Sequence, residues 1–227
     1  MSKIPVIAID GPSGSGKGTI ARRVARALDW NLLDSGALYR LVALTATGTG
    51  QTDASEEVLA ELASDLEVRF EADDNGEERV WLGDSDVSSE LRTEECGQLA
   101  SYVAALPAVR NSLLGLQKGF RTAPGLVADG RDMGTTVFPD AMLKVFLTAS
   151  AEERAKRRHK QLKDKGIDVS LPALSRDIED RDRRDSERSV APLRAAEDAR
   201  LLDSSNLSID EVTQTVMAWA HEQINAN

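Results

Sequence analysis

Residues 9–19 read IDGPSGSGKGT: a short apolar run ends, and four glycines and one lysine follow. Gly11, Gly16 and Lys17 fit the pattern G-x-x-x-x-G-K between a predicted strand and a predicted helix. Such a loop wraps a phosphate with backbone N–H groups, which requires torsions and close approaches that side chains obstruct. The helix that follows presents unpaired N–H groups and its positive dipole end to the same anion. We therefore predict a phosphate-binding loop (P-loop) formed by Gly11, Pro12, Ser13, Gly14, Ser15, Gly16, Lys17, Gly18 and Thr19.

The residue after the lysine departs from the usual pattern. The common serine or threonine, which ligates magnesium through its hydroxyl, is replaced by Gly18, and Thr19 follows. The form GKGT is typical of nucleotide and nucleoside-monophosphate kinases. Because Mg²⁺ gives up its water reluctantly, we expect it to be held through water and phosphate oxygens, with no direct protein ligand. Asp129 ends another apolar run and resembles the acidic strand end that assists magnesium in many P-loop proteins, so it is a candidate to act through water.

Short apolar runs alternate with segments of helical spacing along most of the chain. Five runs are typical of buried strands, at residues 5–10, 31–34, 125–129, 143–148 and 200–203. Helical segments are predicted at residues 19–28, 37–46, 53–66, 94–120, 151–165, 172–188 and 208–224. Alternation of this kind predicts an α/β fold, a five-stranded parallel sheet with helices on both faces. With the loop motif, it indicates a P-loop NTPase fold.

The ends of several helices are also visible in the sequence. Asp53 with Glu56, and Ser208 with Glu211, are capping patterns that predict where two helices begin. Pro107 interrupts or bends the long helical segment in which it lies.

One segment differs from the alternation of strands and helices. Residues 67–82 alternate around Asn75-Gly76, a strong signal for a β-hairpin. We therefore place this hairpin in an inserted subdomain with a small antiparallel sheet.

Polar residues follow two of the predicted strands at the edge where α/β sheets bind ligands. The segment DSGALYR places Ser35, Tyr39 and Arg40 beside the loop, although Arg40 alone is also typical of a solvated helix. The segment VADGRDMG ends a second strand, and its acid–arginine–acid cluster favours ligand binding over a salt-bridged turn. The residues concerned are Asp129, Gly130, Arg131 and Asp132.

Arginines concentrate in the last third of the chain. Residues 177–188 read DIEDRDRRDSER, and most such runs are solvated helix faces with weak ion pairs. However, one helix face carries Arg181, either Arg184 or Asp185, and Arg188, and arginine binds phosphate oxygens in a bidentate manner. The basic helix before them adds Arg154, Arg157 and Arg158.

This distribution indicates phosphoryl transfer between two nucleotides, in which neutralisation of charge dominates. The acceptor phosphate oxygen is already anionic, so the reaction needs no general base. In agreement, His159 and His221 both lie in predicted surface helices. Water would attack the donor phosphate, so we expect an arginine-bearing flap to close over the substrates.

Bulk composition limits the function classes. The net charge of −10 disfavours a non-specific nucleic-acid or membrane-surface binder. Cys96 is the single cysteine, so no internal disulfide framework is expected. The N-terminal apolar run is too short for a signal segment, and no run reaches the ~20 residues of a membrane span. We expect a cytoplasmic enzyme with neither nucleic-acid nor membrane partners.

Four motifs in order, IAIDGPSGSGKGT, LLDSGALYR, ADGRDMGT with VFPDA, and RDRRDSERSVAPL, together resemble the bacterial-type cytidylate kinase family. The resemblance extends from about residue 4 to residue 220. It implies transfer of phosphate from ATP to CMP or dCMP with Mg²⁺, and a monomer. It also implies a single P-loop kinase domain with a core at 1–50 and 121–227, a monophosphate-binding insertion at about 51–120 and a mobile helical lid at about 154–188.

The resemblance also implies site residues. The loop from Gly11 to Thr19 would bind ATP phosphates, and Arg157 and Arg158 would reach the donor from the lid. The CMP phosphate would be held by Ser13, Arg40, Arg131 and Arg188. Cytosine would be read by Ser101, Arg110 and Asp132, and the ribose by Arg181 and Asp185.

Alternatives to this function remain open at the level of the residues. Another small-molecule kinase of this fold would act on UMP, AMP, shikimate or gluconate. A nucleotide-dependent switch is a different class, but the N-K-x-D motif expected of it is absent from the sequence. Binding of nucleic acid through the basic helix near 154–165 is disfavoured by net charge.

Overall fold

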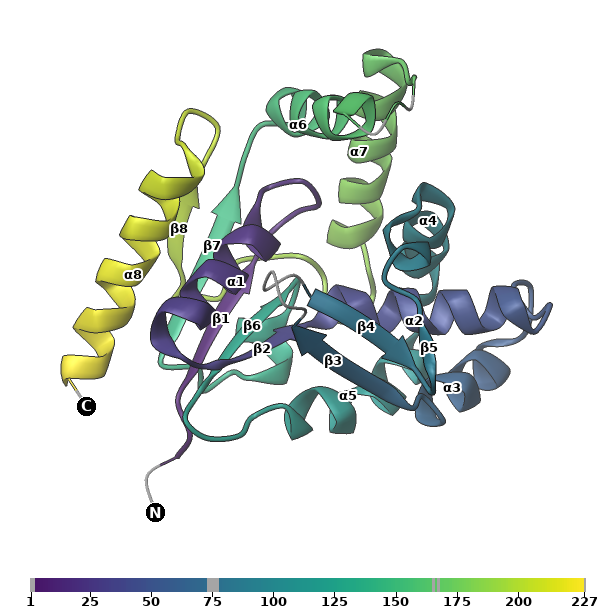
Figure 1. The fold of residues 1–227 in the computed structure, drawn as a ribbon, viewed down its shortest axis with the longest axis horizontal. Coiled ribbons are helices and arrows are strands. Elements are labelled where there is room, and N and C mark those ends of the chain that lie inside the picture. Colours follow the sequence, from purple (N-terminus) through teal and green to yellow (C-terminus); the bar gives the residue numbers. More distant parts are fainter. Residues whose placement is uncertain (1–2, 73–77, 165, 167, 227) are drawn as a thin grey trace. The chain divides into compact units, whose positions relative to one another are not determined.

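The computed structural model describes residues 3–72, 78–164, 166 and 168–226. The chain divides into two compact units. Their helices and strands are labelled in Figure 1. The first, which we call the sheet unit, comprises residues 1–34 and 117–227. The second, the inserted unit, comprises residues 35–116.

The sheet unit is built on a five-stranded sheet within the described residues, and the predicted parallel strands are confirmed. Every strand pair in it is parallel, and the strand order is β2-β6-β1-β7-β8. The inner strands β1 and β6 are buried along their whole length, because both faces of a parallel sheet are covered, whereas the edge strands β2 and β8 are partly exposed. The strands of the sheet are β1 Val6–Asp10, β2 Asn31–Asp34, β6 Leu126–Gly130, β7 Leu143–Thr148 and β8 Arg200–Asp203.

The helices of the sheet unit follow its strands as the periodicity predicts. They are α1 Lys17–Leu28, α6 Ala151–Asp164, α7 Leu171–Ser186 and α8 Ile209–Ala226, with a turn of π-helix, η2, at Met133–Val137. The predicted capping box is confirmed at the start of α8, where the Glu211 N–H donates to Ser208 Oγ and the Ser208 N–H donates to Glu211 Oε2.

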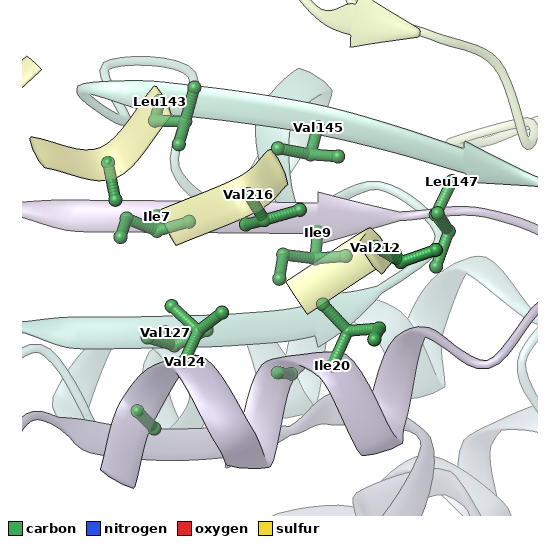
Figure 2. Close-up of a cluster of buried hydrophobic side chains, with 13 residues drawn as sticks. Ile7, Ile9, Ile20, Val24, Val127, Leu143, Val145, Leu147, Val212 and Val216 are labelled. Carbon is green, nitrogen blue, oxygen red and sulfur yellow. The ribbon is translucent and has the colours of Figure 1, made fainter. Parts of the chain in front are cut away.

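One hydrophobic cluster joins α1 and α8 to the same face of the sheet (Figure 2). Ile7 and Ile9 of β1 are fully buried, and they alternate along the strand toward this face. The partners from α1 and α8 recur at helical spacing, and the cluster includes Ile20, Val24, Val212 and Val216. Burial of side chains of this size contributes about 1.5–3 kcal/mol each. This core therefore fixes the start of α1 next to the end of β1.

The carboxyl ends of the strands coincide at one edge of the sheet. Asp10 of β1 is paired with Gly130 of β6, and Asp34 of β2 is paired with Asp129 of the same strand. The loop after β1 and the turn after β6 therefore emerge side by side.

The inserted unit contains an antiparallel three-stranded sheet among its described residues, with order β3-β4-β5. The predicted hairpin is confirmed by the pairing of β3 with β4, although its Asn75-Gly76 turn lies outside the described residues. The two-residue strand β5 has no signal in the sequence. The strands are β3 Val68–Ala72, β4 Glu78–Leu82 and β5 Ser85–Asp86.

The helices of the inserted unit show one correct and one wrong boundary. The segment predicted at 94–120 forms two helices, and Pro107 begins the second, as expected for the first position of a helix. The start predicted from Asp53 is wrong, because Ser55 is the N-cap residue of α3. The elements are α2 Ser35–Gly48, α3 Glu56–Ser64, η1 Glu90–Arg92, α4 Glu94–Val103 and α5 Pro107–Gly119, whose last residues belong to the sheet unit.

Among the described helices none is by itself long and apolar enough to cross a bilayer. The sharply bent pair α4 and α5 reaches the necessary length and hydropathy only when the two helices are taken together.

Candidate active site

The P-loop connects β1 to α1 and is shaped by its glycines. A Cβ on Gly11 would lie 2.1 Å from the carbonyl oxygen of Leu147, so only glycine fits against this strand. Gly14 and Gly16 have φ values of 78° and 93°, in the left-handed region that other residues adopt at a cost. In the described structure α1 has neither a side-chain cap nor an acidic residue in its first turn. A helix end of this kind is suited to bind an anion.

Lys17 is folded back over this loop and is 8% exposed. Its Nζ donates to the carbonyl oxygen of Pro12 at 3.3 Å and lies 3.9 Å from Asp129 Oδ1. Burial lowers the pKa of Lys17 to about 8, and the charge of Arg131 acts in the same direction. Burial likewise raises the pKa of Asp129 to about 6, against the attraction of Lys17. At neutral pH the site therefore holds an ion pair rather than two neutral groups.

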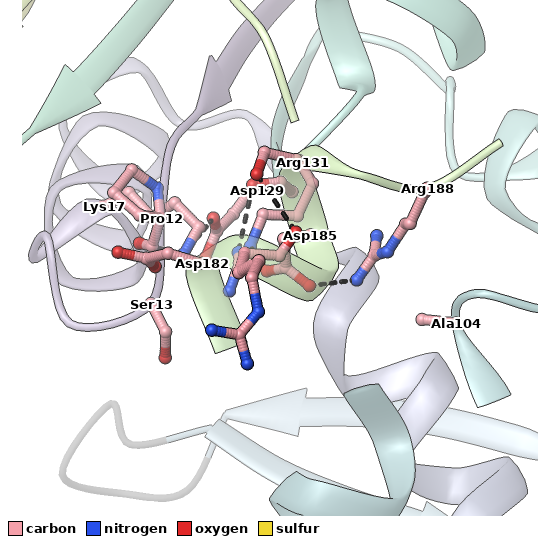
Figure 3. Close-up of polar contacts among 12 residues, drawn as sticks. Pro12, Ser13, Lys17, Ala104, Asp129, Arg131, Asp182, Asp185 and Arg188 are labelled. Carbon is pink, nitrogen blue, oxygen red and sulfur yellow. Dashed lines mark hydrogen bonds and ion pairs between the residues drawn. The ribbon is translucent and has the colours of Figure 1, made fainter. Parts of the chain in front are cut away.

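Asp185 of α7 gathers two arginines around one carboxylate (Figure 3). Arg131, which follows β6, donates from Nε to Asp185 Oδ2 at 3.0 Å, and Arg188 donates to Oδ1. Asp185 is 1% exposed. Burial works to raise its pKa, but Arg131 and Arg188 outweigh burial and hold the pKa below its usual value. Arg131 is thus brought to Asp185 and Arg188 from 54 residues away along the chain, and the three residues predicted from sequence form one buried cluster.

Arg154 joins the P-loop to α7, a role that sequence reasoning missed. The side chain is 4% exposed and donates to the carbonyl oxygens of Ala149 and Ser13. It also pairs with both carboxylate oxygens of Asp182. Arg154 and Asp182 lie in highly charged runs, so no sequence signal separates them from the surface charges around them.

Arg157 of α6 contacts the protein backbone at the P-loop. It donates to the carbonyl oxygen of Ser15 at 3.3 Å and to that of Ser204 at 2.6 Å. The hydroxyl of Ser204 also donates to the Ser15 carbonyl, at 3.1 Å. The guanidinium therefore lies next to the loop, while Arg158 is partly buried on the same helix.

The inserted unit positions the other predicted residues. Arg40 donates to the carbonyl oxygen of Leu91 at 2.7 Å, and it lies over Gly97, whose Cβ would meet the guanidinium at 3.0 Å. Ser35 and Tyr39 precede it on α2 and are buried. These contacts disfavour the alternative that Arg40 is an ordinary solvated helix arginine.

The base-reading candidates Arg110 and Ser101 lie on α5 and α4. Arg110 is 7% exposed, donates to the carbonyl oxygen of Ala104 at 3.1 Å and lies 5.5 Å from the ring centre of Tyr39. Ser101 is 2% exposed, and its hydroxyl has no hydrogen-bond partner among the described residues. A buried hydroxyl without a partner is unusual and is consistent with a ligand site.

The other members of the predicted cluster after β6 are fixed by the turn itself. Asp132 is 2% exposed, and its carbonyl oxygen accepts from the N–H groups of Thr136 and Val137. Gly130 has no room for a side chain, because a Cβ would lie 2.7 Å from Met133.

The residues around Gly18 fit a magnesium ion held through water. A Cβ at Gly18 would lie 3.0 Å from Asp129 Oδ2, so the carboxylate occupies the space where the usual hydroxyl side chain would begin. Asp129 Oδ1 accepts no hydrogen bond in the described structure. The described residues contain no group of three or more acidic, histidine or cysteine side chains that would ligate a metal directly. The donor set is one carboxylate, which suits a hydrated cation on phosphate oxygens.

A family model described as "Cytidylate kinase" matches residues 7–222. The chain belongs to the cytidylate kinase family. A relative named cytidylate kinase from Methylococcus capsulatus is 60% identical, over 95% of this chain and 96% of its own length. Another of that name, from Pseudomonas paraeruginosa, is 58% identical over 97% of this chain and 96% of its own. A solved structure of an uncharacterized protein from Eubacterium ventriosum, 10% identical, shares the fold with a TM-score of 0.53, over 97% of this chain and 99% of its own.

Membership of this family decides between the acceptors that the residues left open. The chain is an ATP-dependent nucleoside-monophosphate kinase that phosphorylates CMP. The alternative acceptors UMP, AMP and shikimate are not favoured.

Proposed function

We propose that this enzyme transfers the γ-phosphoryl group of ATP in line to a phosphate oxygen of CMP or dCMP. The bond between the γ-phosphorus and the bridging oxygen breaks, the acceptor oxygen bonds to phosphorus, and ADP leaves with the electron pair. No proton has to be removed, because the acceptor oxygen is already anionic. The observation that carries this proposal is the pairing of β1 with β6, which brings the P-loop and Arg131 to one edge.

The donor phosphates are assigned to residues Gly11 to Thr19. The backbone N–H groups of the loop and the first turn of α1 supply hydrogen bonds, and Lys17 supplies a charge. A pKa of about 8 keeps Lys17 mostly protonated at neutral pH.

The acceptor phosphate is assigned to Ser13, Arg40, Arg131 and Arg188. In support, Asp185 already holds Arg131 and Arg188 on one carboxylate, as a phosphate would. Arg181 and Asp185 are assigned to the ribose, and Ser35, Tyr39 and Gly130 to the surroundings of the acceptor.

Cytosine is assigned to Ser101, Arg110 and Asp132. A carboxylate accepts from the amino group at N4, and an arginine donates to N3 and O2. Uracil has an oxygen at position 4, which would face Asp132 with lone pair against lone pair. A polar group left unpaired in this way discriminates by at most roughly 10⁴-fold.

Mg²⁺ is the cofactor we expect with ATP, and it would supply neutralisation of the phosphate charge. Asp129 would hold it through water. The ionised form that this requires predominates above the Asp129 pKa of about 6.

We further propose that residues of about 154–188 form a lid, from which Arg157 and Arg158 reach the donor. The core at 1–50 and 121–227 and the monophosphate-binding insertion at about 51–120 are the corresponding functional parts. The enzyme is proposed to act as a monomer in the cytoplasm, which sedimentation and cell fractionation test.

The test of this function is the release of ADP with CMP, dCMP, UMP and AMP as acceptors in turn. We expect kcat/KM to be highest for CMP or dCMP. Asp132→Ala is expected to reduce the preference for CMP over UMP by more than it reduces turnover of UMP. Equal losses on both acceptors would contradict the assignment of Asp132 to the base.

A further inference from the structure

Asp10, the last residue of β1, is a buried acid. Neither the P-loop motif nor the proposed substrate contacts assign it a role. It is 5% exposed. One carboxylate oxygen accepts from the N–H of Met133 and the other from the N–H of Gly134, each at 2.8 Å. Both donors belong to the backbone of η2, the turn directly after Arg131 and Asp132.

The two hydrogen bonds determine the orientation of the turn. A carboxylate that accepts two neighbouring N–H groups holds them in a fork, and hydrogen bonds to an ionised acceptor are about twice as strong as neutral ones. Asp132 is then held from both sides. Its own carbonyl oxygen accepts from Thr136 and Val137, and the next peptide N–H is fixed on Asp10.

Asp10 itself cannot move with the turn. It ends the central strand of the sheet and precedes Gly11, which packs directly on the backbone of Leu147. The approach of η2 is also close, because a Cβ on Gly134 would lie 3.4 Å from Asp10 Oδ2 and 3.1 Å from Lys144 Cδ. The carboxylate is therefore a rigid connection between the start of the P-loop and the turn after β6.

Retention of a carboxylate at this position is energetically unfavourable for folding alone. Burial raises the pKa of Asp10 to about 7, although the N–H groups of Gly134 and Met133 act to lower it. Ionisation of Asp10 therefore costs free energy in the folded state, a cost that a neutral acceptor at this position would not carry.

We propose that Asp10 is a positioning residue for CMP recognition, which fixes the turn that carries Arg131 and Asp132 to the strand that leads into the P-loop. This inference rests on the proposed function, in which those two residues bind CMP. Asp10 touches neither substrate and acts through the backbone of Met133 and Gly134.

The test compares kcat/KM for CMP and for UMP at pH 8 in four variants: Asp10→Asn, Asp132→Ala, the double variant, and Asp210→Asn as control. Asp210 is an exposed acid, paired with Arg23, so its change removes a charge without touching the turn. The ratio of the two kcat/KM values does not depend on the fraction of folded enzyme, so loss of stability alone leaves it unchanged.

We expect Asp10→Asn to lower the CMP-over-UMP ratio by about tenfold and to raise KM for CMP, since small displacements of positioning groups cost rates of this order or more. Asp210→Asn should leave the ratio unchanged. In the Asp132→Ala background, Asp10→Asn should change the ratio no further, because it acts through Asp132. If Asp10→Asn is insoluble, Gly134→Ala adds a methyl group to the turn that Asp10 holds, 3.1 Å from Lys144 Cδ and 3.4 Å from Asp10 Oδ2, and it should lower the ratio in the same direction.

A parallel loss on both acceptors with an unchanged ratio and KM in Asp10→Asn would overturn the proposal, as would full additivity with Asp132→Ala. Failure of the proposed function has a different signature. If Asp132→Ala leaves the ratio intact while Asp10→Asn still raises KM for CMP, the assignment of Asp132 to cytosine fails and the positioning of Arg131 by Asp10 stands. If neither variant changes either quantity, both fail.

Discussion

Asp185→Asn removes one negative charge from the centre of two guanidinium groups and leaves the size of the side chain unchanged. The carboxylate accepts from Arg131 Nε at 3.0 Å and from Arg188, and it is 1% exposed. The side chains of Arg131 and Arg188 are themselves only 16% and 4% exposed. The substitution therefore leaves two buried cations near each other without their shared anion.

The size of the effect follows from this burial. Breaking a buried ion pair by removal of one partner costs about 3–5 kcal/mol, because the remaining charge stays desolvated. We expect the lower end, about 3 kcal/mol, since the asparagine oxygen still accepts one hydrogen bond. The direction in which the effect on stability changes with pH also follows from the lowered pKa of Asp185. A carboxyl with a lowered pKa stabilises the fold above its usual pKa and loses that contribution in acid, so the gap between wild type and variant should close as the pH falls through that range.

The assay is urea unfolding at pH 7.5 and at low pH, with Asp180→Asn as matched control. Asp180 lies on the same helix and pairs with Arg183, but both side chains are more than half exposed. A pair of this kind contributes about 0–1 kcal/mol. Sulfate should restore stability to Asp185→Asn more than to wild type, because an anion replaces the missing carboxylate. At 100 times its dissociation constant a ligand adds about 2.7 kcal/mol.

Two results would refute this reasoning. The first is a free energy of unfolding for Asp185→Asn at pH 7.5 that differs no more from wild type than that of Asp180→Asn. The second is equal stabilisation of both proteins by sulfate, which would mean that the two arginines do not form an anion site once Asp185 is neutral.

Three further predictions concern the loop and its strand. Lys17→Met should lose most turnover while its thermal melting stays cooperative, and near-normal turnover would contradict the loop assignment. In the wild type, kcat/KM for ATP should fall above about pH 8 as Lys17 loses its proton. Gly11→Ala should unfold or strongly destabilise the protein, because its Cβ would meet the Leu147 oxygen. Gly115→Ala on α5 meets nothing within 4 Å and should raise the free energy of unfolding by about 0.5–1 kcal/mol. Similar melting temperatures for the two variants would refute the contrast. The folded-state pKa of Asp10 lies above its unfolded value, so its contribution to stability is lost as the pH rises from about 4 to about 7. The free energy of unfolding of Asp10→Asn should therefore rise by up to about 3 kcal/mol relative to wild type between pH 5 and pH 7. A constant difference in urea midpoints across that range would show that Asp10 titrates normally.

Local chemistry explains what sequence reasoning predicted correctly. The five strands, the P-loop and the capping box of Ser208 with Glu211 depend on short-range patterns that operate within a few residues. The failed start of α3 at Asp53 is of the same kind, since several residues compete to cap one helix and Ser55 is chosen. The short strand β5 was missed because two residues carry no periodicity.

The sequence by itself determined the alternation of strands and helices along the chain, the phosphate loop with its glycines, and the arginine-rich character of the site. Only the tertiary structure decided which charges are buried and with whom. Arg131 with Asp185, Arg154 with Asp182, and Asp10 with the amides of η2 join positions 28 to 124 residues apart. A charged residue in a run looks the same whether it is solvated or paired, because its energy depends on the dielectric surroundings and partners that folding creates, and these are set by distant parts of the chain.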